Sequence, residues 1–355
     1  MTFSEWQHNL GRPVASGLLK QYIEDFVVTE DLGYAPSGDG EHVFLWVEKQ
    51  GQNTAFVAEQ LAKQTGLPLR NVTYAGRKDK FALTRQWFGL HAPKGIAMSP
   101  ETLRIEGVTV LSHTRHHKKL RVGGLKGNHF SLTLRGIDDI DATIARLETV
   151  KHQGVPNYFG DQRFGVRRND DGTVSMGGTL TLAMRMVEGE VIRNRNKRNM
   201  AISALRSALF NTLVSERIQA GMFDQVYLGD ACSLQGSNSF FIATEDTLSD
   251  SNSRYIAKDL SPSAPLVGEG ENPTKEMVGE WESSIIERYQ RLADSLKAAG
   301  VKTLRRAIKV WPENLTWQRD NDTLIVGFGL PSGCFATSVL RECINLNETQ
   351  ESGNE

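Results

Sequence analysis

Hydrophobic and polar residues follow one another along this chain in patterns that predict both strands and helices. Residues 41–49, EHVFLWVEK, are rich in Val, Phe and Trp and follow the turn-like PSGDG, which predicts a strand. In residues 129–137, HFSLTLRGI, apolar and polar side chains alternate, so that Phe130 and His129 should face opposite sides of a half-buried strand. Further strands are predicted at residues 71–74 and 322–330.

Apolar residues that recur three or four positions apart predict several helices, most of them ended by a glycine. The predicted helices cover residues 53–66, 138–154, 198–221, 275–300 and 334–343. Two polar stretches, SDSNSR at 249–254 and SPSAPLVGEGENPT at 261–274, are interpreted as surface loops. Strands dominate before residue 150 and return after 310, whereas helices dominate from about 200 to 300. This pattern favours a mixed-sheet domain built from both ends of the chain, with a second domain inserted between them.

The composition is that of a globular protein. The chain has 355 residues, 39% of them hydrophobic and 23% charged, which suits about two domains. The first residues lack the features of a signal peptide, and no apolar stretch approaches the roughly 20 residues of a membrane span. Cys232, Cys334 and Cys343 are too few and too scattered to predict a disulfide framework or a zinc site. We therefore expect a cytoplasmic protein with free thiols.

Charge is balanced overall but segregated along the sequence. The 41 basic and 42 acidic residues nearly cancel, yet residues 113–126 hold five Lys or Arg and no acid, and residues 193–198 hold four. Residues 245–282 hold nine acids and three bases. Such segregation can give a nucleic-acid-binding face on a neutral molecule, and two solvated surface runs explain it equally well.

One carboxylate, Asp79, lies among cations: Arg77, Lys78, Lys80 and Arg85. A cation within about 4 to 6 Å keeps a carboxylate ionised, which suits a nucleophile better than a general acid. The predicted strand 71–74 runs into this segment, so the charges should lie on a turn at a strand end, where functional groups often occur. Taken alone, the pattern is more typical of a solvated ion-pair network.

Several separated motifs change this interpretation, because in their order and spacing the sequence resembles the TruD family of tRNA pseudouridine synthases. The motifs are GLLKQYIEDFVVTEDLGYAPSGDGEH, YAGRKDKFALTRQW, LKGNHF, GVPNYFGDQRFG, RNRNKRN with SALRSALFN, and LPSGCFATSVLRE. The resemblance covers nearly the whole chain. It implies an α+β fold, in which a catalytic domain (residues 1–153 and 304–355) with a mixed, mainly antiparallel sheet is interrupted by an inserted α/β TRUD domain (154–303).

The resemblance also implies an activity, the isomerisation of uridine at position 13 of tRNA to pseudouridine. Neither a cofactor nor a metal is implied, and the expected partner is tRNA alone, bound by a monomer in the cytoplasm. Because the reaction has no redox change and no external reactant, one carboxylate is enough in principle. It can add to the ribose or the uracil, or remove the ribose 2′ proton, and the sequence leaves all three routes open.

Matched position by position, Asp79 corresponds to the catalytic aspartate of the family and Lys20 to a basic residue suited to keep it ionised. Phe26, Asn128 and Phe328 match positions that contact the substrate uridine, and Phe130 matches an aromatic residue that stacks on it. An isolated Phe is more often a core residue, which is the alternative for each of them. Nine cations are candidates for contacts with the RNA backbone: Arg77, Lys78, Lys80, Arg115, Lys118, Lys119, Arg193, Arg195 and Lys197.

The sequence leaves further questions open. Either Lys78 or Lys80 could face the reacting group. A non-catalytic RNA-binding protein and an N-glycosidase remain alternatives, although an RNA-binding protein would not need a carboxylate among phosphate-seeking cations.

Overall fold

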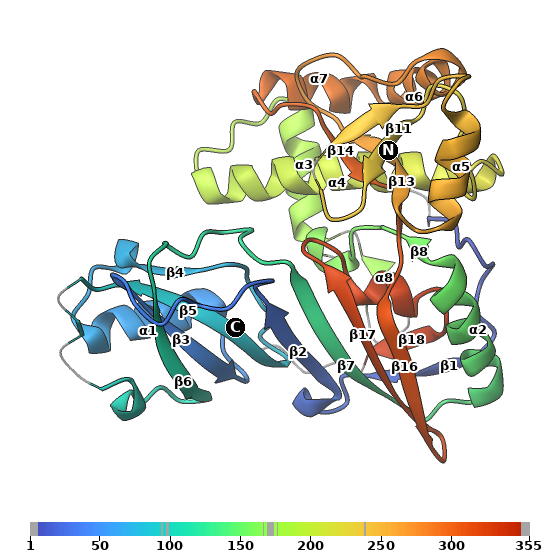
Figure 1. Ribbon diagram of the computed structural model, residues 1–355. Coiled ribbons are helices and arrows are strands. Elements are labelled where there is room, and N and C mark those ends of the chain that lie inside the picture. Colours follow the sequence, from blue (N-terminus) through green and yellow to red (C-terminus); the bar gives the residue numbers. More distant parts are fainter. Residues whose placement is uncertain are drawn as a thin grey trace. The chain divides into compact units, whose positions relative to one another are not determined.

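The computed structural model describes residues 6–93, 95–96, 99–165, 167–168, 174–175, 177–237 and 239–348 (Figure 1). The first five residues, included in the search for a signal peptide, lie outside these ranges. The chain forms two compact units. We call Val14–Thr143, Pro312–Gly333 and Asn345–Glu355 the sheet unit, and Met1–Pro13, Ile144–Trp311 and Cys334–Ile344 the helical unit. The inserted domain expected at 154–303 stays a prediction.

A mixed sheet dominates the sheet unit and, within the described ranges, has ten strands (Figure 1). Seven of them follow the order β16-β17-β7-β2-β5-β3-β6, while β1 pairs with β7 and β18, and β4 pairs with β5. The pairs β2/β5 and β1/β18 are parallel and the others antiparallel, so the prediction of an α+β fold with a mainly antiparallel sheet is confirmed. The strands are β1 (Ser16–Leu19), β2 (Phe26–Asp31), β3 (His42–Lys49), β4 (Val72–Tyr74), β5 (Leu83–His91), β6 (Val108–His116), β7 (Gly127–Arg135), β16 (Glu313–Asp320), β17 (Thr323–Pro331) and β18 (Asn345–Glu348).

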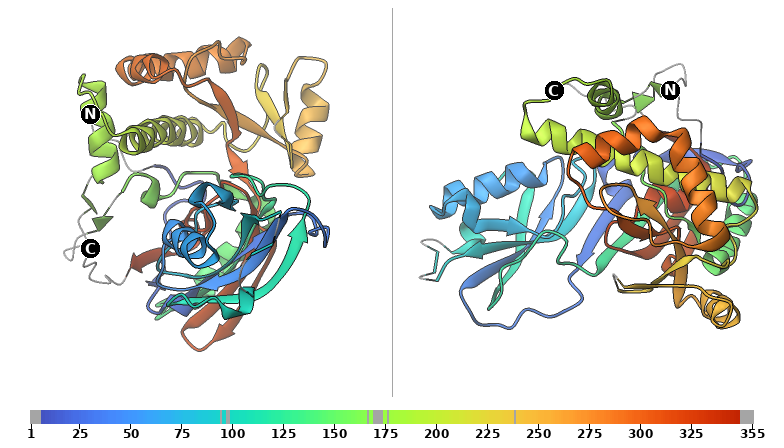
Figure 2. Two further views of the ribbon diagram at one scale, coloured as in Figure 1. Left: turned by 90° about the vertical axis from the view of Figure 1, so that its left-hand side faces the viewer. Right: turned by 90° about the horizontal axis from the view of Figure 1, so that it is seen from above.

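Helix α1 (Thr54–Thr65) covers part of one sheet face, as Figure 2 shows from two sides. Its buried residues Val57, Ala58 and Leu61 recur at helical spacing, and Gly66 ends the helix with a left-handed backbone, φ +69°. These side chains form one cluster with residues of strands β3 and β5: Val43, Leu45, Val47, Phe88 and Leu90. This core therefore lies between α1 and strands β3 and β5.

The helical unit is built around helix α4 (Arg195–Gln219), whose apolar side chains, including Leu205 and Leu209, are buried in its core. A four-stranded sheet, counted within the described ranges, has the order β12-β11-β13-β14. No helix in the described part of the chain has both the length and the apolar character of a membrane span. The remaining elements are α2 (Ile140–Gln153), which begins in the sheet unit, β8 (Val155–Pro156), β9 (Arg167–Arg168), β10 (Val174–Ser175), α3 (Gly178–Val187), β11 (Ala231–Leu234), β12 (Phe240–Ile242), α5 (Leu248–Ile256), β13 (Leu260–Leu266), α6 (Glu276–Arg288), α7 (Gln290–Ala298), β14 (Leu304–Ala307), β15 (Lys309–Val310) and α8 (Ala336–Leu340).

Both loop predictions in this unit are wrong where the chain forms regular structure. Residues 249–254 lie in α5, and the first part of 261–274 is the buried strand β13. The serines of β13 suggested a turn, but their hydroxyl groups are satisfied inside the protein: Ser261 donates to Pro262 O and Ser263 to Ala231 O. Tertiary pairing with β11 and β14 therefore overrides the local preference.

The single helix predicted over 275–300 is also wrong, because the chain forms α6 and α7 with a break at Tyr289. Tyr289 O accepts hydrogen bonds from Leu292 N and Ala293 N, which start the second helix. Ile285 on one side of the break and Leu292 on the other are both buried in the same core. The apolar spacing therefore continues across the break and does not reveal it. The predicted helix 334–343 is shorter, Ala336–Leu340.

Candidate active site

Three phenylalanine rings lie together on the sheet face formed by β2, β7 and β17. Phe328 pairs directly with Phe130, and Phe130 with Val28, two positions from Phe26 on the same face. The ring centroids of Phe26 and Phe130 are 6.3 Å apart with the planes at 78°, and those of Phe130 and Phe328 are 5.5 Å apart at 30°. Phe26 and Phe328 are buried, whereas Phe130 is half-buried. The register thus gathers the three predicted aromatic residues.

Asp79 lies in the segment that connects β4 to β5, on a loop after a strand, as predicted. Its Oδ2 accepts a hydrogen bond of 2.5 Å from Lys20 Nζ, and its Oδ1 accepts one of 3.2 Å from Phe81 N. The side chains of Asp79 and Lys20 are 18% and 19% exposed. An ammonium group at this distance stabilises the ionised carboxylate, which still reaches solvent.

Lys20 connects the Asp79 carboxylate to the sheet face that bears Phe26, Phe130 and Phe328, which we call the aromatic face. It follows β1 and has a left-handed backbone, φ +62°, which is uncommon for a residue with a side chain. Its Nζ lies 4.4 Å from the ring centroid of Phe26 while it donates to Asp79. Such strained residues concentrate at functional sites. The structure therefore brings Lys20, Asp79 and the three rings into one site.

Asn128 lies on the same face of β7, opposite Glu30 of β2 and Leu330 of β17. Its amide Oδ1 is shielded from solvent and has no hydrogen-bond partner among the described residues. Leaving a buried acceptor unpaired costs about 1 to 3 kcal/mol, which a ligand donor would recover. His129 is exposed, and its Nε2 lies 3.9 Å from Asp31, so it stays off this face as the alternation predicts.

Lys78 makes an ion pair of 2.7 Å with Glu30, and the two side chains are 6% and 0% exposed. The other oxygen of Glu30 accepts a hydrogen bond from Trp87 N. A cation so enclosed is better suited to hold the loop than to contact a phosphate group, which disfavours the RNA-backbone role considered for Lys78.

The other cations near Asp79 differ in their surroundings. Lys80 Nζ lies 5.3 Å from the ring centroid of Phe81, Arg77 is exposed, and Arg85 makes an ion pair of 2.9 Å with Glu48. None of these contacts joins a cation side chain to the Asp79 carboxylate. The contact with Asp79 comes instead from Lys20, which lies far away in the sequence.

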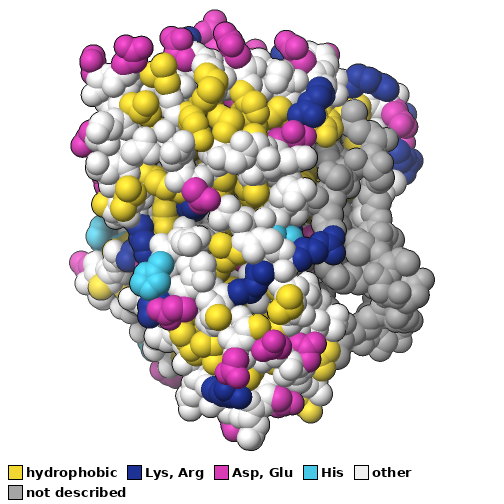
Figure 3. Space-filling model, turned by 90° about the vertical axis from the view of Figure 1, so that its right-hand side faces the viewer, with side chains coloured by type: hydrophobic (Ala, Val, Ile, Leu, Met, Phe, Trp, Pro, Cys, Tyr) yellow, Lys and Arg dark blue, Asp and Glu magenta, His cyan; other side chains and the backbone are white. Residues whose placement is uncertain are grey.

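The two basic runs lie on different units. In the sheet unit Lys118 and Lys119 are exposed after β6, while Arg115 donates to Gly40 O. In the helical unit Arg193, Arg195 and Lys197 are exposed at the start of α4. On the face drawn in Figure 3, acidic and basic side chains are interspersed. The predicted contacts of these runs with RNA stay a prediction.

Sequence reasoning missed Lys49, which is fully buried and donates a hydrogen bond of 2.8 Å to the main-chain oxygen of Asp79. Burial lowers the pKa of Lys49 to about 8, although the nearby Asp79 charge acts in the opposite direction. The sequence did hold a signal. Along β3 every second residue, Val43, Leu45 and Val47, faces the core, and Lys49 takes the next position of that series.

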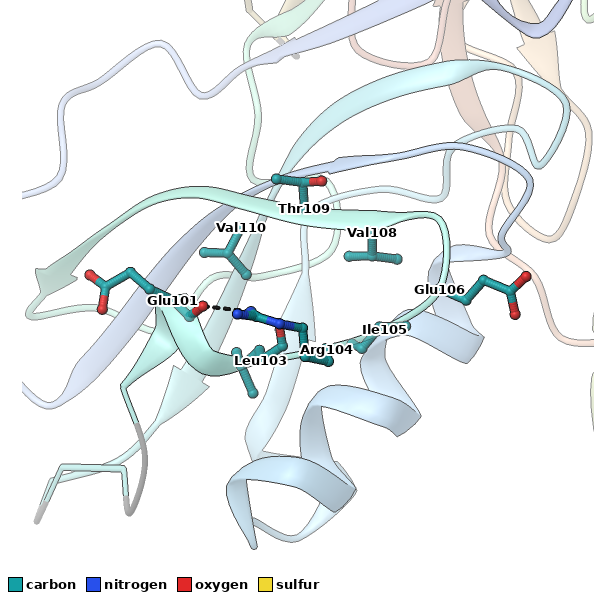
Figure 4. A pocket seen from close by; sticks show the side chains of 8 residues that line it. All are labelled: Glu101, Leu103, Arg104, Ile105, Glu106, Val108, Thr109 and Val110. Carbon is teal, nitrogen blue, oxygen red and sulfur yellow. Dashed lines mark hydrogen bonds between the residues drawn. The ribbon is translucent and has the colours of Figure 1, made fainter.

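The sheet unit also has a hollow of about 460 Å³ lined by residues between Glu101 and Val110 (Figure 4). Arg104 Nη1 donates to Glu101 O across it. None of the predicted site residues lines this hollow, so it is separate from the candidate active site.

In the described part of the chain, His, Cys, Asp and Glu side chains form no group of three that could hold a metal ion, and the cysteines are free.

Comparison with known proteins bears on what this arrangement of residues does. The model of the family described as tRNA pseudouridine synthase D (TruD) matches residues 9–180 and 189–343. The chain belongs to the TruD family. The resemblance drawn from the motifs is thereby confirmed.

Relatives of this family match the chain over nearly its whole length. The tRNA pseudouridine synthase D of Pseudoalteromonas atlantica is 46% identical over 100% of both chains. That of Proteus mirabilis is 44% identical over 96% of this chain and 95% of its own. The crystal structure of a putative TruD from Methanosarcina mazei covers 97% of this chain and 95% of its own with a TM-score of 0.69. At 21% identity, that likeness shows the fold alone.

Proposed function

We propose that this TruD-family chain converts uridine 13 of tRNA into pseudouridine and that Asp79 is the group that reacts. The contact between Lys20 and Asp79 beside three phenylalanine rings carries the proposal. It combines a carboxylate held in its ionised form with a surface on which a base can stack. The family match and the names of the relatives support tRNA pseudouridine synthesis as the reaction.

The reaction balances without an external reactant. The bond from ribose C1′ to uracil N1 breaks, the uracil turns, and a bond forms from C1′ to C5. The proton of C5 leaves and N1 gains a proton, so neither component is oxidised or reduced. An ionised Asp79 can begin this sequence by attack on the ribose or the base, or by removal of the 2′ proton. No step calls for a cofactor.

The aromatic face suits a uracil that has left the base stack of the RNA. Removing a base from its stack costs a few kcal/mol, and stacking on an aromatic side chain returns roughly 1 to 3 kcal/mol. Phe130 is the least buried of the three rings and is our candidate for this contact. The amide of Asn128, whose Oδ1 has no partner among the described residues, can accept a hydrogen bond from uracil N3.

We propose tRNA as the partner, bound through its backbone by the exposed cations of both units and acted on by a monomer in the cytoplasm. These assignments, and the inserted TRUD domain at 154–303, rest on the family match and on charge. Contacts to phosphate groups give affinity that falls with salt and carry little sequence information. Selectivity should therefore come from the shape of the tRNA and from its unstacked bases.

The test of the reacting group is Asp79→Asn, which keeps the shape of the side chain and removes its charge. We expect tRNA binding to be retained and pseudouridine formation to be lost. Mass measurement of the RNA should show no change with the parent enzyme, because isomerisation conserves mass. Free uracil and an abasic site would instead indicate an N-glycosidase, and continued isomerisation by Asp79→Asn would exclude Asp79 as the reacting group.

The position is tested by sequencing chemically labelled pseudouridines in tRNA from cells with and without this protein. We expect the signal at position 13 to disappear with the protein. Loss of signal at other positions alone would contradict the substrate assignment, and no loss at all would favour a binding protein without catalysis.

A further inference from the structure

Three polar side chains are buried beneath the loop that carries Asp79. Lys49 ends strand β3, Thr54 begins helix α1, and Gln86 lies within strand β5. Their exposed fractions are 0%, 2% and 0%. These residues come from three elements that meet at one end of the core between α1 and the sheet.

Each of these side chains makes a hydrogen bond to the backbone of the loop. Lys49 Nζ donates to Asp79 O at 2.8 Å, and Gln86 Nε2 donates to Gly76 O at 3.1 Å. Thr54 Oγ1 accepts from Lys78 N at 2.9 Å and donates to Gln86 Oε1 at 3.1 Å.

The chain next to Lys49 adds a main-chain contact, since Gly51 N donates to Lys80 O at 3.1 Å. The backbone from Gly76 to Lys80 is therefore held on both sides of Asp79.

Packing alone does not call for these residue types. Lys49 continues the apolar series Val43, Leu45 and Val47 on β3, and Gln86 shares its face of β5 with Phe88 and Leu90. An apolar residue at either position would continue the core, and burying a polar group is unfavourable unless it is hydrogen-bonded. Departures from the expected pattern are most common at functional sites. Both departures are directed at the same loop, which Thr54 also contacts.

We propose that Lys49, Thr54 and Gln86 are positioning residues, which hold the Gly76–Lys80 backbone so that the Asp79 carboxylate meets the substrate in a reactive geometry. The inference rests on the proposed function of Asp79 and assigns a role to residues beyond it. A displacement of about 1 Å at a reacting group can cost about 10²-fold in rate. A loop attached at a single point would allow that displacement, whereas hydrogen bonds from three elements oppose it.

Lys49 also adds a charge to this arrangement. Burial lowers its pKa to about 8, Asp79 acts to raise the pKa, and Lys78 acts to lower it. Lys78 is itself paired with Glu30, and Asp79 with Lys20. Below pH 8 the protonated ammonium group holds the Asp79 carbonyl, and above pH 8 the proton and its charge are lost. The rate should therefore fall as the pH rises through about 8, and Lys49→Arg, which stays protonated, should lack that fall.

The experiment measures kcat and KM for tRNA in Lys49→Met, Thr54→Val and Gln86→Leu, with thermal unfolding of each protein. We expect kcat to fall by about 10- to 10²-fold while KM changes by less than about twofold, because the contacts with RNA are not altered. Thr54→Ser should restore activity by restoring the hydroxyl group. The matched control is Thr84→Val on β5, where the hydroxyl is buried without a hydrogen-bond partner among the described residues, and its activity should be unchanged.

The outcomes separate the two proposals. Parent-like kcat in folded Lys49→Met and Thr54→Val, with Asp79→Asn inactive, would overturn the positioning role and leave the proposed function intact. An active Asp79→Asn would instead overturn the proposed function. If Lys49→Met does not fold, Thr54→Val with its Thr54→Ser rescue and the pH profile of Lys49→Arg decide the question. A loss of unfolding temperature with unchanged kcat would mean that the three residues only stabilise the fold.

Discussion

Two carboxylates in this chain, one in each unit, are held by cations in opposite ways. In the helical unit Asp230 is 0% exposed and accepts hydrogen bonds from both terminal nitrogens of Arg217, at 2.7 and 2.6 Å, and from Tyr227 N at 2.8 Å. Burial alone would lower the pKa of Arg217, but the charge and hydrogen bonds of Asp230 raise it. In the sheet unit the side chain of Asp79 is 18% exposed and lies beside Lys20. The ion pair within the helical core encloses its carboxylate, whereas the pair for which we propose a chemical role leaves its carboxylate partly exposed, within reach of a substrate.

The two ion pairs should differ most when each carboxylate is removed, because one change should lower stability and the other should lower the reaction rate. Asp230→Ala leaves Arg217 charged and buried without its partner, which should cost about 3 to 5 kcal/mol of unfolding free energy. Asp79→Asn should cost less than about 1 kcal/mol, because the pair is partly exposed, yet it should reduce the rate by at least about 10³-fold. Urea unfolding and a pseudouridine assay on both variants measure this. Equal losses of stability would contradict the distinction.

Removing the cation from Asp79 should have the next largest effect. In Lys20→Met the carboxylate loses the ammonium group that holds it at 2.5 Å, so that both its counter-charge and its position change and activity should fall by about 10²-fold. The matched control is Lys302→Met, which removes an exposed ion pair of 2.7 Å with Glu269 and should leave activity unchanged. The pseudouridine assay compares these variants, and parent-like activity in Lys20→Met would assign Lys20 a different role.

The aromatic face should contribute less than the charges. Phe130→Ala removes the stacking surface and should lower kcat/KM by about 5- to 150-fold, the equivalent of roughly 1 to 3 kcal/mol per stacked base. Ile325→Ala on the neighbouring strand β17 is the control, since Ile325 is 41% exposed and lies off the series that holds Phe328. Steady-state kinetics on tRNA compare the two variants. Similar losses in both would mean that Phe130 acts through the stability of the sheet.

The smallest effect should come from the exposed basic run of the sheet unit. Lys118→Ala combined with Lys119→Ala should weaken tRNA binding a few-fold and reduce the slope of log affinity against log salt by about one to two units, with kcat unchanged. Binding measured from about 50 to 200 mM salt tests this. An unchanged slope would place these two lysines outside the RNA contact.

The sequence predicted those parts of the site that depend on short-range pattern. Alternation along β7 separates Phe130 from His129, and strand pairing then places Phe328 beside Phe130. The partner of Asp79 could not come from local pattern, because Lys78 and Arg85 form ion pairs elsewhere, whereas Lys20 follows the distant strand β1. The family resemblance, rather than periodicity, supplied that assignment.

The contact of Lys49 with the Asp79 loop was missed for a different reason. Residues 41–49 were predicted as a strand, but the final Lys of an apolar series is usually interpreted as the point where a strand reaches solvent. Whether such a lysine is buried depends on which loop covers it, here the Asp79 loop that begins about 25 residues later in the chain. Strand β13 was missed for a similar reason, because the burial of its serines depends on contacts that are distant in sequence. Both hydroxyl groups donate to backbone oxygens, and one of these, Ala231 O, belongs to another strand.

Strand β18 runs parallel to β1, with Ser16 opposite Asn345 and Leu19 opposite Glu348, and β1 leads directly into Lys20. Contacts so distant in sequence form late, because a long chain segment must be brought together before they contribute free energy. During synthesis, β1 can gain this neighbour only after the ribosome has released residues 345–348. Lys20 is therefore among the last parts of the site to be fixed in position. A nascent chain that already contains every predicted site residue still lacks β18, the parallel neighbour of the strand that leads into Lys20.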